Sequence, residues 1–277
     1  MKYRTMPLLC LLVVLAPFRA GSATQQSPAS PLDTGYRQMY NLQFSAAHSS
    51  FQEWEQMHSS DPLGPTSDAA AYLFAEFDRL GILQSRLFVS DKHFVQRQVE
   101  QPDPAAKKAF DAALERSNRL ASEALAKSPQ DTNALFAEVM NLGMRADYLA
   151  LIEKRNLASL SMMKRNGLLA DKLLKLDPNC YDAYLAVGVE NYVLGLSPAP
   201  LRWLLSLYGA QTDKNAGLRK LRLTAEKGHY LRPFARLLLA VAALRNHDRN
   251  QARRLLRALA QEFPKNVLYR KELAKLQ

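Results

Sequence analysis

The side chains that most often catalyse reactions or bind metals lie far apart in this sequence. None of the five histidines has another histidine four residues away, which is the spacing of a zinc site on one helix. The chain contains no Cys-x-x-Cys pair, no Gly-rich phosphate loop and no Gly-x-Ser-x-Gly elbow. Glu53 and Glu55 are neighbours, but residues two apart on a helix point to different faces. We therefore predict no catalytic residue, no metal ligand and no cofactor site.

Arginines are the residues best suited to binding a ligand, and they gather near the C-terminus. Residues 201–277 hold 17 Lys and Arg against 5 Asp and Glu, whereas the rest of the chain is close to neutral. Arg249, Arg253 and Arg257 recur every four residues. The apolar residues of Ala252–Leu259 follow a helical spacing on the opposite side. We expect the three arginines on the outward face of one helix.

Two interpretations of this arginine face stay open. Guanidinium groups bind carboxylates and phosphates through paired donors, so the face could recognise an anionic lipid, an acidic polymer or an acidic protein segment. Alternatively, it is an ordinary solvated face with surface ion pairs, because long helices need charged exteriors. Aromatic residues are not interleaved with the arginines, which disfavours nucleic acid as a partner.

The first 23 residues have the pattern of a secretory signal. A short basic start precedes the apolar run Pro7–Pro17, and the small residues Gly21, Ser22 and Ala23 follow. We expect cleavage after Ala23, with Ala20 as the second choice, and a periplasmic or extracellular protein. An uncleaved anchor is the alternative, but the apolar run is well short of the roughly 20 residues that span a bilayer. Export also disfavours nucleic acid as a partner.

The chain expected after cleavage has a leader and one folded region. Residues 24–32 are polar and rich in Pro and Ser, and residues 33–277 form the predicted domain. Only one cysteine is left, Cys180, so no internal disulfide can form. The apolar fraction of the whole chain is 48%, and Leu, Ala, Arg and Lys are abundant while Gly is scarce. This composition excludes global disorder and favours helices.

Prolines divide the chain into helical units. Between them the apolar residues have helical spacing almost throughout, and each proline ends a unit because it lacks an N–H donor. The clearest unit is Leu231–Pro264, and earlier units cover Tyr36–Pro62 and Asp131–Pro178, the last with unusually long helices. Arg86–Val89 is the only weak strand candidate.

Two more helices are expected over Ser67–Leu80 and Pro104–Lys127. Ser67 and Asp68 are good helix starts because their side chains can accept backbone N–H groups. Asp103 followed by Pro104 is another, since proline suits the first helical turn.

The last unit resembles a tetratricopeptide (TPR) repeat. Five of its residues stand at the distances from the closing proline that the TPR pattern has. They are Leu239, Ala240, Ala252, Leu256 and Leu259. The family's aromatic positions hold Arg236 and Ala243 instead, so the repeat is degenerate. The resemblance implies an all-α TPR-like solenoid of stacked antiparallel helix pairs in a single domain.

Residues 184–240 carry a more specific pattern, GVENYVLGLSPAPLRWLLSLYGAQTDKNAGLRKLRLTAEKG. It contains Gly188, a pair of prolines at Pro198 and Pro200, and a helix start at Asp213. This pattern resembles the core of the eukaryotic tetratricopeptide-repeat-protein-thirty-nine and inclusion-clearance family. The resemblance covers about a fifth of the chain. It implies TPR architecture and work at a lipid surface, and it transfers no active site. Uncharacterised exported bacterial TPR proteins are a nearer resemblance.

Residues 198–208 allow two interpretations. Trp203 and Tyr208 belong to an apolar cluster beside the two prolines, and Arg202 interrupts it, so a transmembrane hairpin is excluded. The segment is either a buried helix pair inside the solenoid or a hairpin that touches a membrane or a ligand. Trp203 and Tyr208 therefore join the three arginines as candidate binding residues.

The sequence favours a binding protein over an enzyme, because helical solenoids usually bind partners. The first hypothesis is an exported TPR-like scaffold or adaptor whose concave groove binds a protein or peptide in the cell envelope. The alternative is a peripheral membrane or anionic-ligand binding factor that uses the 198–208 hairpin and the basic C-terminal face. A catalytic function is the least favoured.

Overall fold

The computed structural model describes residues 29–82, 101–196 and 213–276, and within these ranges the protein is helical. This part of the chain has eleven α-helices, one short π-helix and no strand, which confirms the all-α prediction for it. The helices are α1 (Pro31–Tyr40), α2 (Phe44–Met57), α3 (Leu63–Arg79), α6 (Pro104–Lys127), α7 (Thr132–Asp147), the π-helix η1 (Tyr148–Ile152), α8 (Asn156–Leu176), α9 (Tyr184–Gly195), α11 (Lys214–Lys227), α12 (Arg232–Arg245), α13 (Arg249–Glu262) and α14 (Val267–Ala274).

Capping side chains explain where many of these helices begin. Asp103 accepts hydrogen bonds from the backbone N–H groups of Ala105 and Ala106, and Pro104 occupies the first position of α6. An aspartate caps α7, α11 and α13 in the same way. The helix predicted over Pro104–Lys127 is therefore confirmed, and its start has the predicted cause.

The start of α3 differs from the prediction. Ser67 and Asp68 are good helix starts by type, yet α3 begins at Leu63 and both residues are buried inside it. Asp61 explains the earlier start. Its Oδ1 accepts a hydrogen bond from the Leu63 N–H at 3.0 Å, and its Oδ2 accepts one from Trp54 Nε1 at 2.8 Å. Asp61 lies just before the N-cap residue Pro62, and its side chain satisfies the N–H of the first residue of α3 ahead of the expected position.

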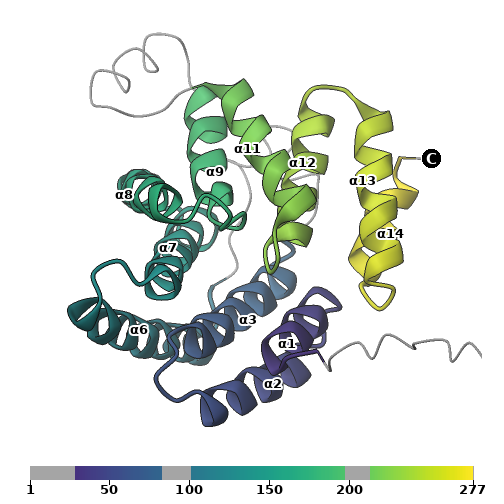
Figure 1. Ribbon diagram of the computed structural model, residues 1–277. Coiled ribbons are helices and arrows are strands. Elements are labelled where there is room, and N and C mark those ends of the chain that lie inside the picture. Colours follow the sequence, from purple (N-terminus) through teal and green to yellow (C-terminus); the bar gives the residue numbers. More distant parts are fainter. Residues whose placement is uncertain (1–28, 83–100, 197–212, 277) are drawn as a thin grey trace, which may run out of the picture.

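Consecutive helices pack against one another through the described residues. The three predicted units correspond to the pairs α1–α2, α7–α8 and α12–α13, and α8 has 21 residues, as expected for the long unit. In the α12–α13 pair, Leu239, Leu256 and Leu259 are buried. Figure 1 shows the helices following one another around the molecule.

The two ends of this succession meet. The ring of Tyr36 in α1 stacks on Tyr230, just before α12, with centroids 4.6 Å apart. Tyr40 donates a hydrogen bond from its hydroxyl to the Tyr230 carbonyl at 3.0 Å, and Asn266 Nδ2 donates one to the Tyr40 carbonyl at 2.8 Å. Figure 1 accordingly shows α1 near α14. Because the first helix contacts the last ones, the inner faces of the helices surround a common space.

Several predictions concern residues outside the described ranges. The signal residues 1–23, the strand candidate Arg86–Val89 and the hairpin residues Trp203 and Tyr208 all lie there. Helix α1 begins at Pro31, two residues before the expected start of the domain. Of the described helices, none is both long enough and apolar enough to cross a membrane.

Candidate functional site

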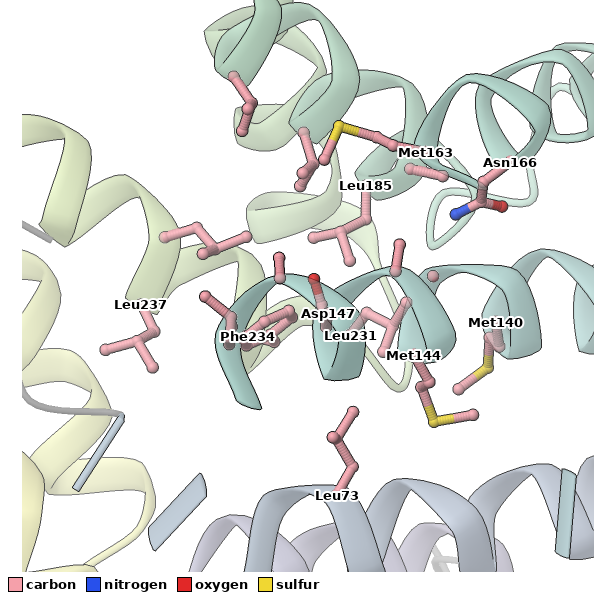
Figure 2. A pocket seen from close by; sticks show the side chains of 18 of the residues that line it. Leu73, Met140, Met144, Asp147, Met163, Asn166, Leu185, Leu231, Phe234 and Leu237 are labelled. Carbon is pink, nitrogen blue, oxygen red and sulfur yellow. The ribbon is translucent and has the colours of Figure 1, made fainter. Parts of the chain in front are cut away.

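A chamber lies where the inner faces of the helices meet. It has a volume of about 490 Å³ and is lined by residues of α1, α3, α7, η1, α8, α9, α11 and α12. Most of the lining side chains are aliphatic, aromatic or methionine (Figure 2). Pockets that bind small molecules in proteins have volumes of roughly 300–1,000 Å³. The chamber therefore has the size of a ligand site and offers mainly apolar contacts.

Methionines give the chamber an adaptable wall. Met140 and Met144 of α7 and Met163 of α8 all line it (Figure 2). A methionine side chain is unbranched, flexible and polarizable, so it fits irregular apolar surfaces and tolerates ligands of different shape. Leu185 of α9 and Phe234 of α12 belong to the same lining.

Two carboxyl groups, those of Asp147 and Asp182, interrupt this apolar lining. Asp147 is the last residue of α7, and it continues the stripe that Met140 and Met144 form along this helix. Figure 2 shows its carboxyl group among the apolar side chains. No hydrogen bond or ion pair joins it to any other residue of the described ranges. Because burial removes water from the charged form, the pKa of Asp147 is raised from 3.8 to about 7.

Asp182 also lines the chamber, but it has a structural role. It accepts hydrogen bonds from the backbone N–H groups of His229, Tyr230 and Leu231 at 2.9, 2.9 and 3.1 Å. These three bonds hold the segment before α12, which is the segment that meets α1. The carboxylate of Asp182 thus has three hydrogen-bond donors, whereas the carboxyl group of Asp147 has no donor among the described residues.

A chain of buried hydrogen bonds holds α7 in place. Asn141 Nδ2 in α7 donates to Ser117 Oγ in α6 at 2.8 Å, and the Ser117 hydroxyl lies 2.6 Å from that of Thr66 in α3. Thr66 in turn donates to the carbonyl oxygen of Pro62 at 2.7 Å. All three side chains are almost completely buried. The bonds therefore fix α7, and with it Asp147, relative to α3 and α6.

Helix α8 and the π-helix fix the end of α7 from the other side. Ser159 in α8 donates to the carbonyl oxygen of Ala146, the residue before Asp147, at 2.8 Å. In η1 the Glu153 N–H donates to the Tyr148 carbonyl at 3.0 Å, and the Tyr148 ring stacks on Phe110 with centroids 5.1 Å apart. Single π-helical turns are frequent at functional sites. Asp147 thus stands directly before a wide turn that is anchored by packing.

The predicted binding residues lie apart from the chamber where the structure describes them. Arg249 and Arg257 are exposed on α13, as expected. Arg253 is partly buried, and its Nη2 donates a hydrogen bond to the Leu276 carbonyl oxygen at 2.6 Å. Trp203 and Tyr208 fall outside the described residues. Of the three arginines, two are therefore free to meet a partner, and Arg253 contacts the C-terminal end of the described chain.

Sequence reasoning did not identify Asp147, although a signal was present. Met140, Met144, Asp147 and Leu151 have the spacing of one helical face, and a single acid stands among apolar residues. A charged residue on an otherwise apolar face, here at the end of a helix, is compatible with a solvent-facing position, a buried partner or a ligand. The sequence alone does not indicate the chamber, because its walls come from helices far apart in the chain.

The described residues contain no group of three or more His, Cys, Asp or Glu side chains that could hold a metal ion. Comparison with known proteins does not assign the chain to a family. No family model matches the chain, and no curated protein matches it significantly. Within the described residues, the chamber and the carboxyl group of Asp147 are the features that point to a function.

Proposed function

We propose that this protein is an exported, TPR-like solenoid that binds an apolar ligand in its inner chamber. The observation that supports this proposal is the apolar chamber of about 490 Å³, which lies between the inner faces of helices α1 to α12. A helical solenoid usually recognises its partner on the inner surface, and here that surface is apolar. Binding to such a surface is driven mainly by the removal of apolar area from water.

A neutral apolar dye tests this proposal. The exported protein is purified and titrated with N-phenyl-1-naphthylamine, whose fluorescence rises in apolar surroundings. Ala186 of α9 lines the chamber, so Ala186→Phe fills part of it and should abolish saturable binding. Ala112 of α6 is exposed, so Ala112→Phe is the matched control and should bind the dye like the wild type.

A second variant that fills the chamber from another wall shows whether a loss of dye binding comes from the filled chamber or from misfolding of one variant. Ala150 of η1 also lines the chamber, and Ala150→Phe approaches from a different wall. Circular dichroism checks that each variant keeps its helices. If both folded filling variants bind the dye as well as the wild type does, the chamber is not the binding site and the proposal is wrong.

A scaffold function is the second candidate, and exposed leucines on α8 favour it. Leu157 is 85% exposed and Leu168 is 62% exposed, and their spacing places them on one face of the helix. Exposed apolar residues on one face can form a docking surface for a protein partner. In-cell cross-linking of the wild type and of a Leu157→Ser, Leu168→Ser variant tests this. A specific partner lost from the variant supports the scaffold, and an unchanged set of partners contradicts it.

The peripheral-membrane alternative stays a prediction, since Trp203 and Tyr208 fall outside the described residues. Flotation with vesicles that contain anionic lipid tests it. Charge reversal of Arg249 and Arg257, the two exposed arginines, should prevent flotation if this alternative is right.

A further inference from the structure

Asp147 is the feature of the chamber that apolar binding alone leaves unexplained. Asp147 is only partly exposed, and a carboxyl group in such apolar surroundings usually has a hydrogen-bond partner, because its ionisation is otherwise not compensated. In the described part of the chain no residue gives Asp147 a hydrogen bond or an ion pair. Burial alone shifts its pKa, so no neighbouring charge acts on it.

A structural role does not account for this carboxyl group. The end of α7 is already held by Ser159, which donates to the carbonyl oxygen of Ala146. The middle of α7 is held by Asn141 through its bond to Ser117. Asp147 takes part in neither contact, and an apolar residue in its place would be less costly to bury. Its chemistry is therefore directed at something that enters the chamber.

We propose that Asp147 binds a protonated amine carried by an otherwise apolar ligand. This inference rests on the proposed function, because it assigns the chemistry of the ligand held in the same chamber. The apolar part of the ligand contacts the walls formed by Met144, Met163 and Phe234, among others (Figure 2). The amine donates a charge-assisted hydrogen bond to the carboxylate, which is stronger than a bond between neutral groups.

Charge complementarity selects an amine over other head groups. Arg245 is the one cation among the described lining residues, and it does not influence the pKa of Asp147. The ionised carboxylate of Asp147 therefore has no positive charge beside it in the described part of the chain, and a ligand can supply one. A ligand carboxylate would instead repel it, and a neutral hydroxyl group would leave its charge uncompensated.

The folded protein is already organised for this pairing. Burying an ion pair usually requires both charges to lose their hydration. Asp147 has already lost part of its hydration in the folded state, so on binding it is mainly the amine that has to leave water. A site arranged in advance in this way gains affinity because less free energy is lost during binding.

Three naphthalene probes of similar size test the inference by isothermal titration calorimetry. They are 1-naphthylmethylamine, 1-naphthylmethanol and 1-naphthoic acid. The measurements are made at about pH 8, where Asp147 is ionised and an alkylamine is still protonated. The proteins compared are the wild type, Asp147→Asn and the surface control Glu115→Gln, in which an exposed carboxylate of α6 is replaced.

The amine should bind the wild type and Glu115→Gln at least about tenfold more tightly than the alcohol does. Asp147→Asn should lose this preference while its affinity for the alcohol stays within about twofold. Equal binding of amine and alcohol, tighter binding of the acid, or an amine preference that survives in Asp147→Asn would each overturn the inference and leave the proposed function intact. Absence of binding for all three probes and for the neutral dye would overturn both.

Discussion

Replacing Asp147 by Asn should stabilise the protein above neutral pH, because Asn cannot ionise inside the chamber. Burial raises the pKa of Asp147 from 3.8 to about 7 in the folded protein. In the unfolded chain the same group ionises near its ordinary value. Between these two values the folded state holds a proton that the unfolded state has released, so stability falls as the pH rises. The loss is complete above the folded pKa.

The size of the effect follows from the shift. A difference of roughly 3 pKa units at about 1.4 kcal/mol per unit gives about 4 kcal/mol once both states are ionised. Water inside the chamber hydrates the carboxylate and lowers this value, so we expect Asp147→Asn to be more stable than the wild type by about 2–4 kcal/mol at pH 8. At about pH 3 the carboxyl group is largely protonated in both states, and the two proteins should have similar stability.

Urea unfolding followed by circular dichroism measures this difference at both pH values. Glu115→Gln makes the same carboxyl-to-amide change on the exposed side of α6, and its stability should follow the wild type at each pH. Comparing variant with wild type at one pH cancels the titration of all other groups. A variant less stable than the wild type at pH 8, or a difference that does not depend on pH, would refute the reasoning. The ionised carboxylate would then have stabilising contacts of its own.

Three other substitutions test the packing of the helices by urea unfolding. Gly167→Ala should destabilise by about 1–3 kcal/mol, because a Cβ atom there would overlap the carboxylate of buried Glu190; an unchanged stability would mean that α8 and α9 pack less closely. Asp103→Ala should cost about 1 kcal/mol through the lost cap of α6, and no loss would mean that the cap is unimportant. Tyr230→Ala should cost about 3–5 kcal/mol and weaken binding of the apolar dye, because it removes the ring that stacks on Tyr36; unchanged dye binding would separate the chain-end contact from the chamber.

The helices were largely predictable because their signals are local. Asp103 and Pro104 begin α6 where their types indicate, and Pro264 follows α13 as a closing proline should. The start of α3 was not predictable in this way. It depends on Asp61, whose second oxygen is held by Trp54 of the preceding helix. When a residue of another helix positions the side chain that begins a helix, the neighbouring sequence does not show where the helix starts.

The candidate site was less predictable, for a physical reason. The rings of Tyr36 and Tyr230 stack although the two residues are far apart in the sequence, and no local spacing predicts that contact. Asp147 did have a signal, since it stands on a face shared with Met144 and Leu151. An acidic residue at the end of a helix, however, gives the same sequence pattern whether its side chain faces solvent or a chamber. Only the positions of α9 and α12 decide between the two, and these follow from tertiary packing.

The contact between α1 and the segment before α12 should be coupled to ligand binding, because α1 and α12 both contribute to the chamber. Met39 and Tyr40 of α1 line it on one side, and Phe234 and Leu237 of α12 line it on the other. A ligand that touches both sides binds better when the ends are together than when they are apart. By linkage, its binding free energy then stabilises the contact between the ends. Without this contact the chamber would lose the wall that α1 forms, so the contact contributes to this site together with Asp147.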